Sequence, residues 1–265
     1  MRVVAEETAL RDEVARLREE LGRLSSALEH ARLQLDEHEL ASSEKERQLE
    51  RYAADLRETF KQERANAQEL RRSYMATVRA LSNAVEARDA YTGKHAERVT
   101  AYGLEIAGAL GIAEAELAEL EFGFLLHDIG KVAIADAILY KPDALNDRER
   151  AVMAQHSSIG AEIVGGIEFL QNAAAVIRSH HERWDGQGYP EGLAGEEIPL
   201  AARVFSVADV LDALTTERPY RPASSLAVAR EMISTEAGRH FDPRVVAAFN
   251  AIPDETLIRI RTEIG

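Results

Sequence analysis

The sequence predicts an all-α protein in which a long helix over residues 1–85 precedes a helical domain over residues 86–265. Residues 1–85 contain no proline and a single glycine, and their apolar residues recur at the three- and four-residue spacings of a helix. From about Glu86 onward, glycine and proline appear, and shorter helical patterns are bounded by capping residues. The sequence has no segments in which polar and apolar residues alternate, as they do in half-buried strands.

The composition excludes several classes of site. None of the 265 residues is cysteine, which rules out disulfides, thiolate catalysis and thiolate metal ligands. A metal would have to be held by histidine and carboxylate. The net charge of −14 disfavours a DNA- or RNA-binding surface, and a phosphodiester ligand would need a local source of positive charge. No apolar run approaches the roughly 20 residues of a membrane span and no hydrophobic leader follows Met1, so we expect a cytoplasmic protein.

The N-terminal helix carries an apolar seam that is typical of a coiled coil. The first seam positions are Leu10, Val14, Leu17, Leu21, Leu24, Leu28 and Leu35. Polar residues interrupt the seam between residues 38 and 45, and it resumes at Leu49. We predict that a second copy of the chain covers the seam in a parallel homodimer. A single helix folded back as a hairpin at the polar interruption is the alternative. The helix would serve as a signal transmitter or as an inert dimerisation stalk.

Capping signals mark the helices of the second region. Thr92 is predicted to cap a helix over residues 93–110, and residues 200–214 are apolar on most sides, as expected of a buried helix. Proline follows the last predicted cap, at the first helical position where it is well tolerated. Together with Thr92, the predicted caps are Asn146, Ser225 and Asp242.

Five histidines and two aspartates are candidate metal ligands. They are His95, His127, His156, His180, His181, Asp128 and Asp209. Neighbours on a helix diverge by about 100°, so the doublet His127–Asp128 can offer an imidazole to one ion and a carboxylate to a second. Asp209 lies within an apolar helix, where a cationic partner would offset the cost of burying its charge. Each residue alone is more often structural, but together they describe a centre large enough for two ions.

Six sequence blocks resemble the HD-GYP subfamily of the HD superfamily of metal phosphohydrolases. Residues 127–131, HDIGK, resemble the HDxGK signature of the superfamily, and residues 180–190, HHERWDGQGYP, resemble the HHExxDGxGYP block of the subfamily. The other four blocks are RDAYTGKHAERV at 88–99, QHSSIGA at 155–161, ADVLDALTTERPYR at 208–221 and FDP at 241–243. The match runs in order from about residue 86 to residue 249, and the block from HHE to GYP is highly specific.

The resemblance implies an HD-type helical bundle that hydrolyses a cyclic dinucleotide, cyclic di-GMP above all, to linear pGpG or to GMP. It assigns metal ligation to all seven candidate ligands, with Asp128 as the bridge between two ions that hold an attacking hydroxide. Lys131 would contact the scissile phosphate, and Arg218 and Arg221 match the basic pair that holds the substrate phosphates. Ligands of this kind accept iron, manganese, nickel or zinc, and we expect iron or manganese.

One position departs from the family pattern. Members with a third metal carry a glutamate four residues before the first ligand histidine, where this sequence has Tyr91. A phenol, with a reference pKa near 10, is a poor ligand for a hard divalent cation. We therefore predict two metals, with linear dinucleotide as a product that can accumulate. The departure also keeps a second function open, a catalytically weak cyclic-dinucleotide receptor that signals through the coiled coil. A mixed guanine–adenine cyclic dinucleotide is an alternative substrate.

Overall fold

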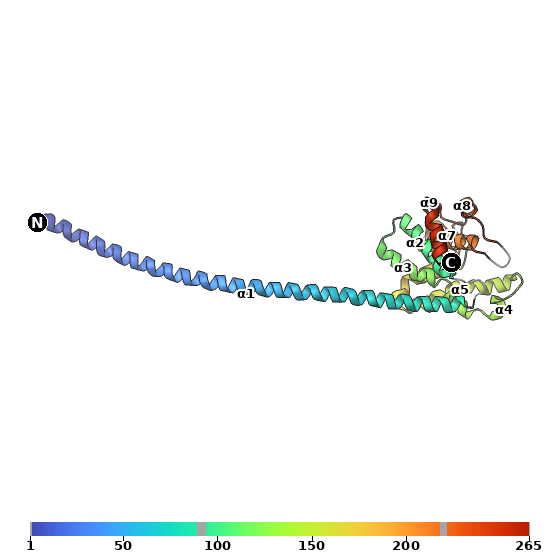
Figure 1. Cartoon of the computed structure of the whole chain (residues 1–265), viewed down its shortest axis with the longest axis horizontal. Coiled ribbons are helices and arrows are strands. Elements are labelled where there is room, and N and C mark those ends of the chain that lie inside the picture. The colour runs from blue at the N-terminus through green and yellow to red at the C-terminus, as the bar shows by residue number, and fades with distance from the viewer. Residues whose placement is uncertain (1, 89–93, 218–221, 265) are drawn as a thin grey trace. The chain divides into compact units, whose positions relative to one another are not determined.

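The computed structural model describes residues 2–88, 94–217 and 222–264, and in these ranges it confirms the all-α prediction (Figure 1). The α-helices are α1 (Arg2–Glu86), α2 (His95–Ala109), α3 (Glu114–Leu125), α4 (Asp136–Leu139), α5 (Asp147–Gly165), α6 (Gln171–Ser179), α7 (Leu200–Thr215), α8 (Leu226–Thr235), α9 (Pro243–Ala251) and α10 (Asp254–Ile264). Short 3-10 helices are η1 (Ile129–Ala133), η2 (Glu168–Leu170) and η3 (Gly195–Glu197). The chain divides into two compact units, residues 1–70 and residues 71–265.

Residues 2–70 belong entirely to α1, which continues without a break through the polar interruption of the seam. The hairpin alternative is therefore wrong. The seam leucines are open to solvent in the single chain, with Leu17 at 56% and Leu28 at 73% exposure. None of the described helices combines the length and the apolar character that crossing a membrane requires.

Three of the predicted caps are confirmed in the second unit. Asn146 accepts a hydrogen bond from the backbone N–H of Glu149, and the Glu149 carboxylate accepts one from the Asn146 N–H, as in a capping box. Ser225 caps α8 by accepting a hydrogen bond from the N–H of Val228, and Asp242 caps α9 by accepting one from the N–H of Arg244. The helix predicted over residues 93–110 begins at His95, and its predicted cap, Thr92, lies outside the described residues.

Two apolar clusters form the interior of the second unit. The larger cluster packs α2 and α7 against the helices that follow them, with Phe124, Phe205 and Phe249 fully buried at its centre. The smaller cluster joins α3, α5 and α6 to the end of α1. Helix α3 contributes to both clusters, because Phe124 faces the larger one while Phe122 faces the smaller one. Residues that follow α3 therefore start from the boundary between the two clusters.

The end of α1 is part of the second unit and of its interior. Val78, Ser82 and Val85 are buried, and Tyr74 stacks on Phe169 with ring centroids 4.1 Å apart. The spacing of the buried positions, three and four residues, places them on one face of α1. The predicted division near residue 85 concerns the functional domain and stays a prediction, whereas the compact unit begins earlier in α1.

Candidate metal centre

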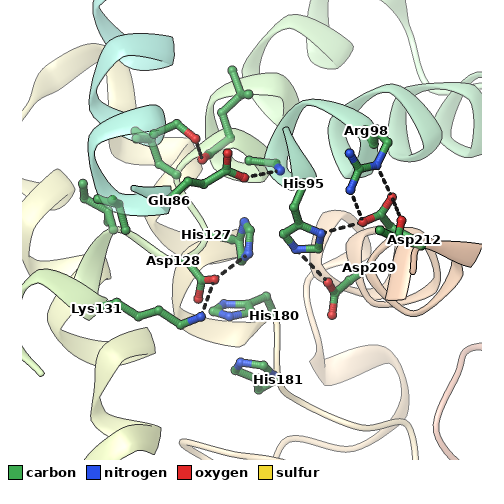
Figure 2. A pocket seen from close by; sticks show the side chains of 17 residues that line it. Glu86, His95, Arg98, His127, Asp128, Lys131, His180, His181, Asp209 and Asp212 are labelled. Atoms are coloured by element: carbon green, nitrogen blue, oxygen red, sulfur yellow. Dashed lines mark hydrogen bonds and ion pairs between the residues drawn. The ribbon is translucent and has the colours of Figure 1, made fainter. Parts of the chain in front are cut away.

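The candidate ligands from five separate segments converge in the second unit; Figure 2 shows all of them except His156, whose ring lies beside those of His180 and His181. His95 begins α2, the doublet His127–Asp128 follows α3, and the doublet His180–His181 follows α6. The remaining two ligands lie within longer helices, His156 in α5 and Asp209 in α7. The side chains fall into two groups, with Asp128 between them.

The first group consists of His156, His180 and His181. Their candidate ligand atoms all lie within 4.8 Å of one another. The Nδ1–H of His156 donates to the carbonyl of Met153, and that of His180 donates to the carbonyl of Ile177, both at 2.7 Å. A carbonyl only accepts, so each Nδ1 carries the proton and each neutral ring presents a lone pair at Nε2. The two Nε2 atoms face each other at 3.2 Å, an arrangement that a cation between them would stabilise.

Burial keeps these three imidazoles neutral. It lowers the pKa of His180 to about 3, with a further contribution from the neighbouring His127. Burial also lowers the pKa of His156 and brings that of His181 well below its usual value. A neutral imidazole is the form that binds a metal, so the group is prepared as a set of nitrogen ligands near neutral pH.

The second group consists of His95, His127 and Asp209. The Nδ1–H of His127 donates to the carbonyl of Phe124 at 2.9 Å, again leaving Nε2 as an acceptor. Nε2 of His95 lies 3.3 Å from Oδ1 of Asp209. Burial alone would lower the pKa of His95, but hydrogen bonds to Asp209 and Asp212 outweigh it and raise the pKa to about 10. The space between His95 and Asp209 therefore favours a positive charge.

Asp128 lies between the two groups. One carboxylate oxygen, Oδ1, is 3.4 Å from Nε2 of His156, and the other, Oδ2, is 3.1 Å from Nε2 of His127. Burial would raise the pKa of Asp128, but its interactions with the neighbouring His127 and Lys131 hold it well below its usual value. Asp128 is thus an ionised carboxylate with one oxygen turned toward each group, which is the disposition of a bridging ligand.

The spacing of the donor atoms fits coordination of divalent cations. Neighbouring nitrogen and oxygen atoms in the centre are 3.1, 3.2, 3.3 and 3.4 Å apart. A metal–ligand bond of about 2.1 Å places adjacent ligands about 3.0 Å apart in an octahedron and about 3.4 Å apart in a tetrahedron. Phe205 closes one side of the centre, with its ring centroid 4.7 Å from that of His127 and 5.5 Å from that of His180.

Asp212 and Arg98 are further members of the centre to which the sequence analysis gave no role. Asp212 is 2% exposed and accepts from Nδ1 of His95 at 2.7 Å and from Nε of Arg98 at 2.6 Å. Carboxylates commonly hold a ligating histidine in this way, fixing the tautomer and the ring orientation. Their spacing could have indicated that they lie near the ligands. Asp212 is three residues after Asp209, and Arg98 is three residues after His95. Three-residue spacing puts side chains on the same helix face.

A close backbone approach brings the doublet His127–Asp128 to His156. Gly130, in η1, lies so near α5 that a Cβ atom added to it would be 1.9 Å from the carbonyl oxygen of His156. The same Cβ would be 2.6 Å from the backbone nitrogen of Gly160. Only glycine permits this contact, since real Cβ contacts below 3.0 Å essentially never occur. The close approach of the two segments is thus a condition for bringing Asp128 beside His156.

The loop after His181 is held firmly against the centre. The carboxylate of Glu182, only 3% exposed, accepts hydrogen bonds from the backbone N–H groups of Glu191, Gly192 and Leu193. The ring of Tyr189 packs on that of His181, with centroids 4.7 Å apart. The segment of residues 184–192 is thus anchored by Glu182 and packs on the centre through Tyr189.

Among the described residues, two cavities open onto the ligands. One, of about 220 Å³, is lined by residues of both groups together with Glu86, Arg98 and Asp212 (Figure 2). The other, of about 240 Å³, lies on the side of the loop and is lined by Tyr189 and His240. His180, His181 and Asp209 line both cavities.

Three further predicted site residues have different outcomes. Lys131 lies beside the centre, where its Nζ is 2.8 Å from Oδ2 of Asp128. Arg218 and Arg221 lie outside the described residues, as does Tyr91. The roles predicted for these residues stay predictions.

Comparisons with known proteins agree with the motifs. A family model described as HD domain matches residues 79–245. The cyclic di-GMP phosphodiesterase response regulator RpfG of Xanthomonas campestris is 42% identical over 69% of this chain and 49% of its own length. The 3'3'-cGAMP-specific phosphodiesterase 2 of Vibrio cholerae is 41% identical over 67% of this chain and 34% of its own length. The cyclic di-GMP phosphodiesterase of Thermotoga maritima is 41% identical over 64% of this chain and 47% of its own length.

The chain thus spans half or less of the length of these relatives. Among solved structures, that of a cyclic GMP-AMP specific phosphodiesterase of Vibrio cholerae, V-cGAP3, aligns with a TM-score of 0.53 at 24% identity. The alignment covers 70% of this chain and 52% of that one. At this identity the likeness establishes a shared fold.

Proposed function

The chain belongs to the HD domain family and carries the motifs of its HD-GYP branch, and from this premise we propose that it is a metal-dependent phosphodiesterase. The proposed substrate is a cyclic dinucleotide, cyclic di-GMP in the first place, and the products are linear pGpG, GMP or both. One observation carries the proposal: two groups of nitrogen and oxygen donors face each other across an ionised carboxylate, Asp128. Such a pair of groups suits two divalent cations, which at this position would supply Lewis acidity and an acidic water as nucleophile.

The residues of the chain would hold and orient the reactants. His127, Asp128, His156, His180 and His181, together with His95 and Asp209, are the proposed metal ligands. Asp128 would belong to both coordination spheres, since its two oxygens face different groups. Asp212 would keep Nε2 of His95 turned toward the centre.

Lys131 is the proposed cation beside the scissile phosphate. Its Nζ contacts the oxygen of Asp128 that faces His127, so the ammonium lies at the edge of the centre. A positive group at this position would stabilise charge that develops on the phosphate oxygens. Arg218 and Arg221 would bind the substrate phosphates. Basic groups here would offset the repulsion that the net charge of −14 exerts on an anionic ligand.

Two metals are proposed, with iron or manganese as the expected ions and nickel or zinc as acceptable substitutes. The donor set of six imidazole or carboxylate side chains around Asp128 supports this number, because it divides into two groups of three. Tyr91 offers a neutral phenol at the position where members with a third metal carry a glutamate. With two metals, hydrolysis that stops at linear pGpG is part of the proposal. We also propose a cytoplasmic location.

We propose that residues 1–85 form a parallel coiled-coil dimer and that residues 86–265 form the phosphodiesterase domain that it regulates. The seam of α1 supports dimerisation, since leucines at alternating three- and four-residue spacings remain largely exposed in the single chain. Two parallel copies would cover the seam by the burial of apolar surface, which is the main driving force of such association.

A chain that lacks residues 1–70 is expected to be folded and monomeric, whereas the complete chain is expected to be a dimer. Removal of residues 1–85 is expected to destabilise the remainder as well, because the burial of Val78 and Val85 contributes about 1.5 kcal/mol or more for each side chain. Light scattering gives the masses, and thermal unfolding followed by circular dichroism gives the stabilities. A dimeric 71–265 chain, or equal stability of the two truncated chains, would contradict this prediction.

Elemental analysis of anaerobically purified protein, combined with an assay of the same sample on cyclic di-GMP, tests the proposed function. We expect about two metal ions per chain, with manganese- or iron-dependent formation of pGpG or GMP measured by chromatography. Parallel assays with 3'3'-cGAMP establish the base preference. Tight binding of the dinucleotide without product, across several metals, would replace the enzyme by the receptor as the proposed function.

A further inference from the structure

The end of α1 contacts the main chain beside His95. Helix α2 begins at His95, and its N-cap residue, Lys94, makes no side-chain capping hydrogen bond. The N–H of Ala96 is among the first four of the helix, which have no acceptor within it. The carboxylate of Glu86, the last residue of α1, accepts this N–H at 2.6 Å (Figure 2). A residue of another helix thus caps the helix that carries the first ligand.

A second contact reaches the main chain before His127. The carbonyl of Leu125 is at the end of α3, where the last four carbonyls of a helix have no donor within it. The hydroxyl of Ser82 donates to this carbonyl at 2.8 Å, in a buried environment. The doublet His127–Asp128 begins two residues later. Ser82 therefore fixes the end of α3 from which the doublet emerges.

A third contact reaches the main chain after Lys131. Nη1 of Arg88 donates to the carbonyl of Val132 at 2.9 Å. Nη2 of the same guanidinium pairs with Asp136, at the start of α4. Arg88 follows the end of α1 by two residues, so it moves with the helix end.

The three contacts share a pattern. Each joins a side chain within residues 82–88 to a backbone atom one or two residues from His95, His127 or Lys131. We propose that Ser82, Glu86 and Arg88, here called the α1 clamp, are positioning residues that set the relative placement of the segments bearing the metal ligands. The inference rests on the proposed function in one respect, that His95 and His127 hold a metal.

The clamp also gives α1 a defined way to act on the centre. A displacement of α1 by the rise of one residue is about 1.5 Å. A hydrogen bond of 2.6–2.9 Å tolerates a lengthening of only about 0.5 Å before it is lost. A one-residue shift of the helix end would therefore exceed the tolerance of the clamp, and His95 would lose its placement relative to His127. Small movements within that tolerance would be transmitted to both ligand-bearing segments.

The test compares metal binding by clamp variants of the complete chain. Metal-free protein is titrated with Mn²⁺ by calorimetry and with Co²⁺, whose visible absorption reports the geometry of its ligands. The variants are Glu86→Ala, Glu86→Gln, Ser82→Ala and Arg88→Ala, with Asn83→Ala and Glu69→Ala as exposed controls on the same helix. The temperature of unfolding of each metal-free variant is measured separately.

We expect Glu86→Ala to weaken Mn²⁺ binding about tenfold, as the loss of an indirect partner of a metal ligand does, and to change the Co²⁺ spectrum. Ser82→Ala and Arg88→Ala should act in the same direction, while Glu86→Gln, which keeps an acceptor oxygen, should bind within about threefold of the parent chain. Both controls should match the parent.

Parent-like Mn²⁺ affinity and Co²⁺ spectra in the three alanine variants of the clamp would overturn the inference, even if their temperatures of unfolding fall. If Glu86→Ala fails to fold, the outcome rests on Ser82→Ala and Arg88→Ala. A parent chain that binds Mn²⁺ but leaves cyclic dinucleotides intact would overturn the proposed function. The inference about the clamp would then be decided by the Mn²⁺ affinities and Co²⁺ spectra of the clamp variants. A parent chain that binds neither ion would overturn both.

Discussion

Replacement of Asp128 by alanine is expected to abolish hydrolysis of cyclic di-GMP and to remove most of the bound metal. Asp128 is the residue whose two oxygens face different ligand groups, at 3.4 Å from Nε2 of His156 and 3.1 Å from Nε2 of His127. Loss of an indirect partner of a metal ligand already costs about 10- to 100-fold in affinity or activity. Loss of a shared ligand should therefore exceed about a hundredfold. Chromatography of the products and elemental analysis of the protein measure the two effects.

Asp128→Asn gives a second form of this test with little change in volume. An asparagine keeps one acceptor oxygen but not the charge or the second oxygen. The Asp128→Asn protein should therefore fold like the parent chain but lack a ligand shared by the two groups. Asp143→Ala, an exposed aspartate, serves as the matched control and should keep both metal and activity. An Asp128→Ala protein that hydrolyses its substrate at the parent rate would exclude Asp128 as the bridge.

Gly130→Ala is expected to disrupt the centre without replacing any ligand. The added Cβ would lie 1.9 Å from the carbonyl oxygen of His156, which belongs to α5 and is held in its helix. Since the clash is with backbone, η1 and α5 must separate, and the doublet His127–Asp128 would move away from His156. We expect the free energy of unfolding to fall by about 3 kcal/mol or more. Metal binding should weaken at the same time.

Gly108→Ala is the matched control for this glycine. Nothing lies within 4 Å of a Cβ added to Gly108, which is in α2. Alanine there should leave stability unchanged or raise it by up to about 1 kcal/mol, because alanine favours helix over glycine. Urea unfolding in the presence of a chelator measures the free energy of unfolding of the metal-free protein, and a titration with Mn²⁺ measures the metal affinity. Gly130→Ala with parent stability and affinity would show that η1 and α5 need no close approach.

The features that the sequence predicted well are local ones. Asn146, Ser225 and Asp242 cap the helices that they begin, so each signal and its effect lie within one turn of each other. The all-α class followed from helical periodicity over long stretches, which needs no knowledge of neighbours. The seven candidate ligands were identified from blocks of characteristic spacing, and they converge on one region of the structure.

Features that depend on distant contacts were not predicted. The cap of α2 comes from Glu86 on another helix, and no pattern around Lys94 indicates it. The burial of Val78 and Val85 was not predicted, because the composition changes only near residue 86. The helical pattern of α1 continues unchanged from its exposed part into the part that packs in the domain. The division of the ligands into two groups on either side of Asp128 likewise depends on how α5, α6 and α7 pack. One missed contact could have been predicted from spacing, since Asp212 shares a helix face with Asp209.

The orientation of three imidazoles has a consequence for how the protein acquires its ions. His127, His156 and His180 each donate Nδ1–H to a carbonyl three residues earlier in the chain. Their rings are thereby oriented by the fold of their own segments, before any ion arrives. The entropic cost of ordering the ligands is met during folding, so the apoprotein is a preorganised chelator that loads and exchanges ions without refolding. Which ion occupies it then depends on supply in the surroundings as well as on intrinsic affinity.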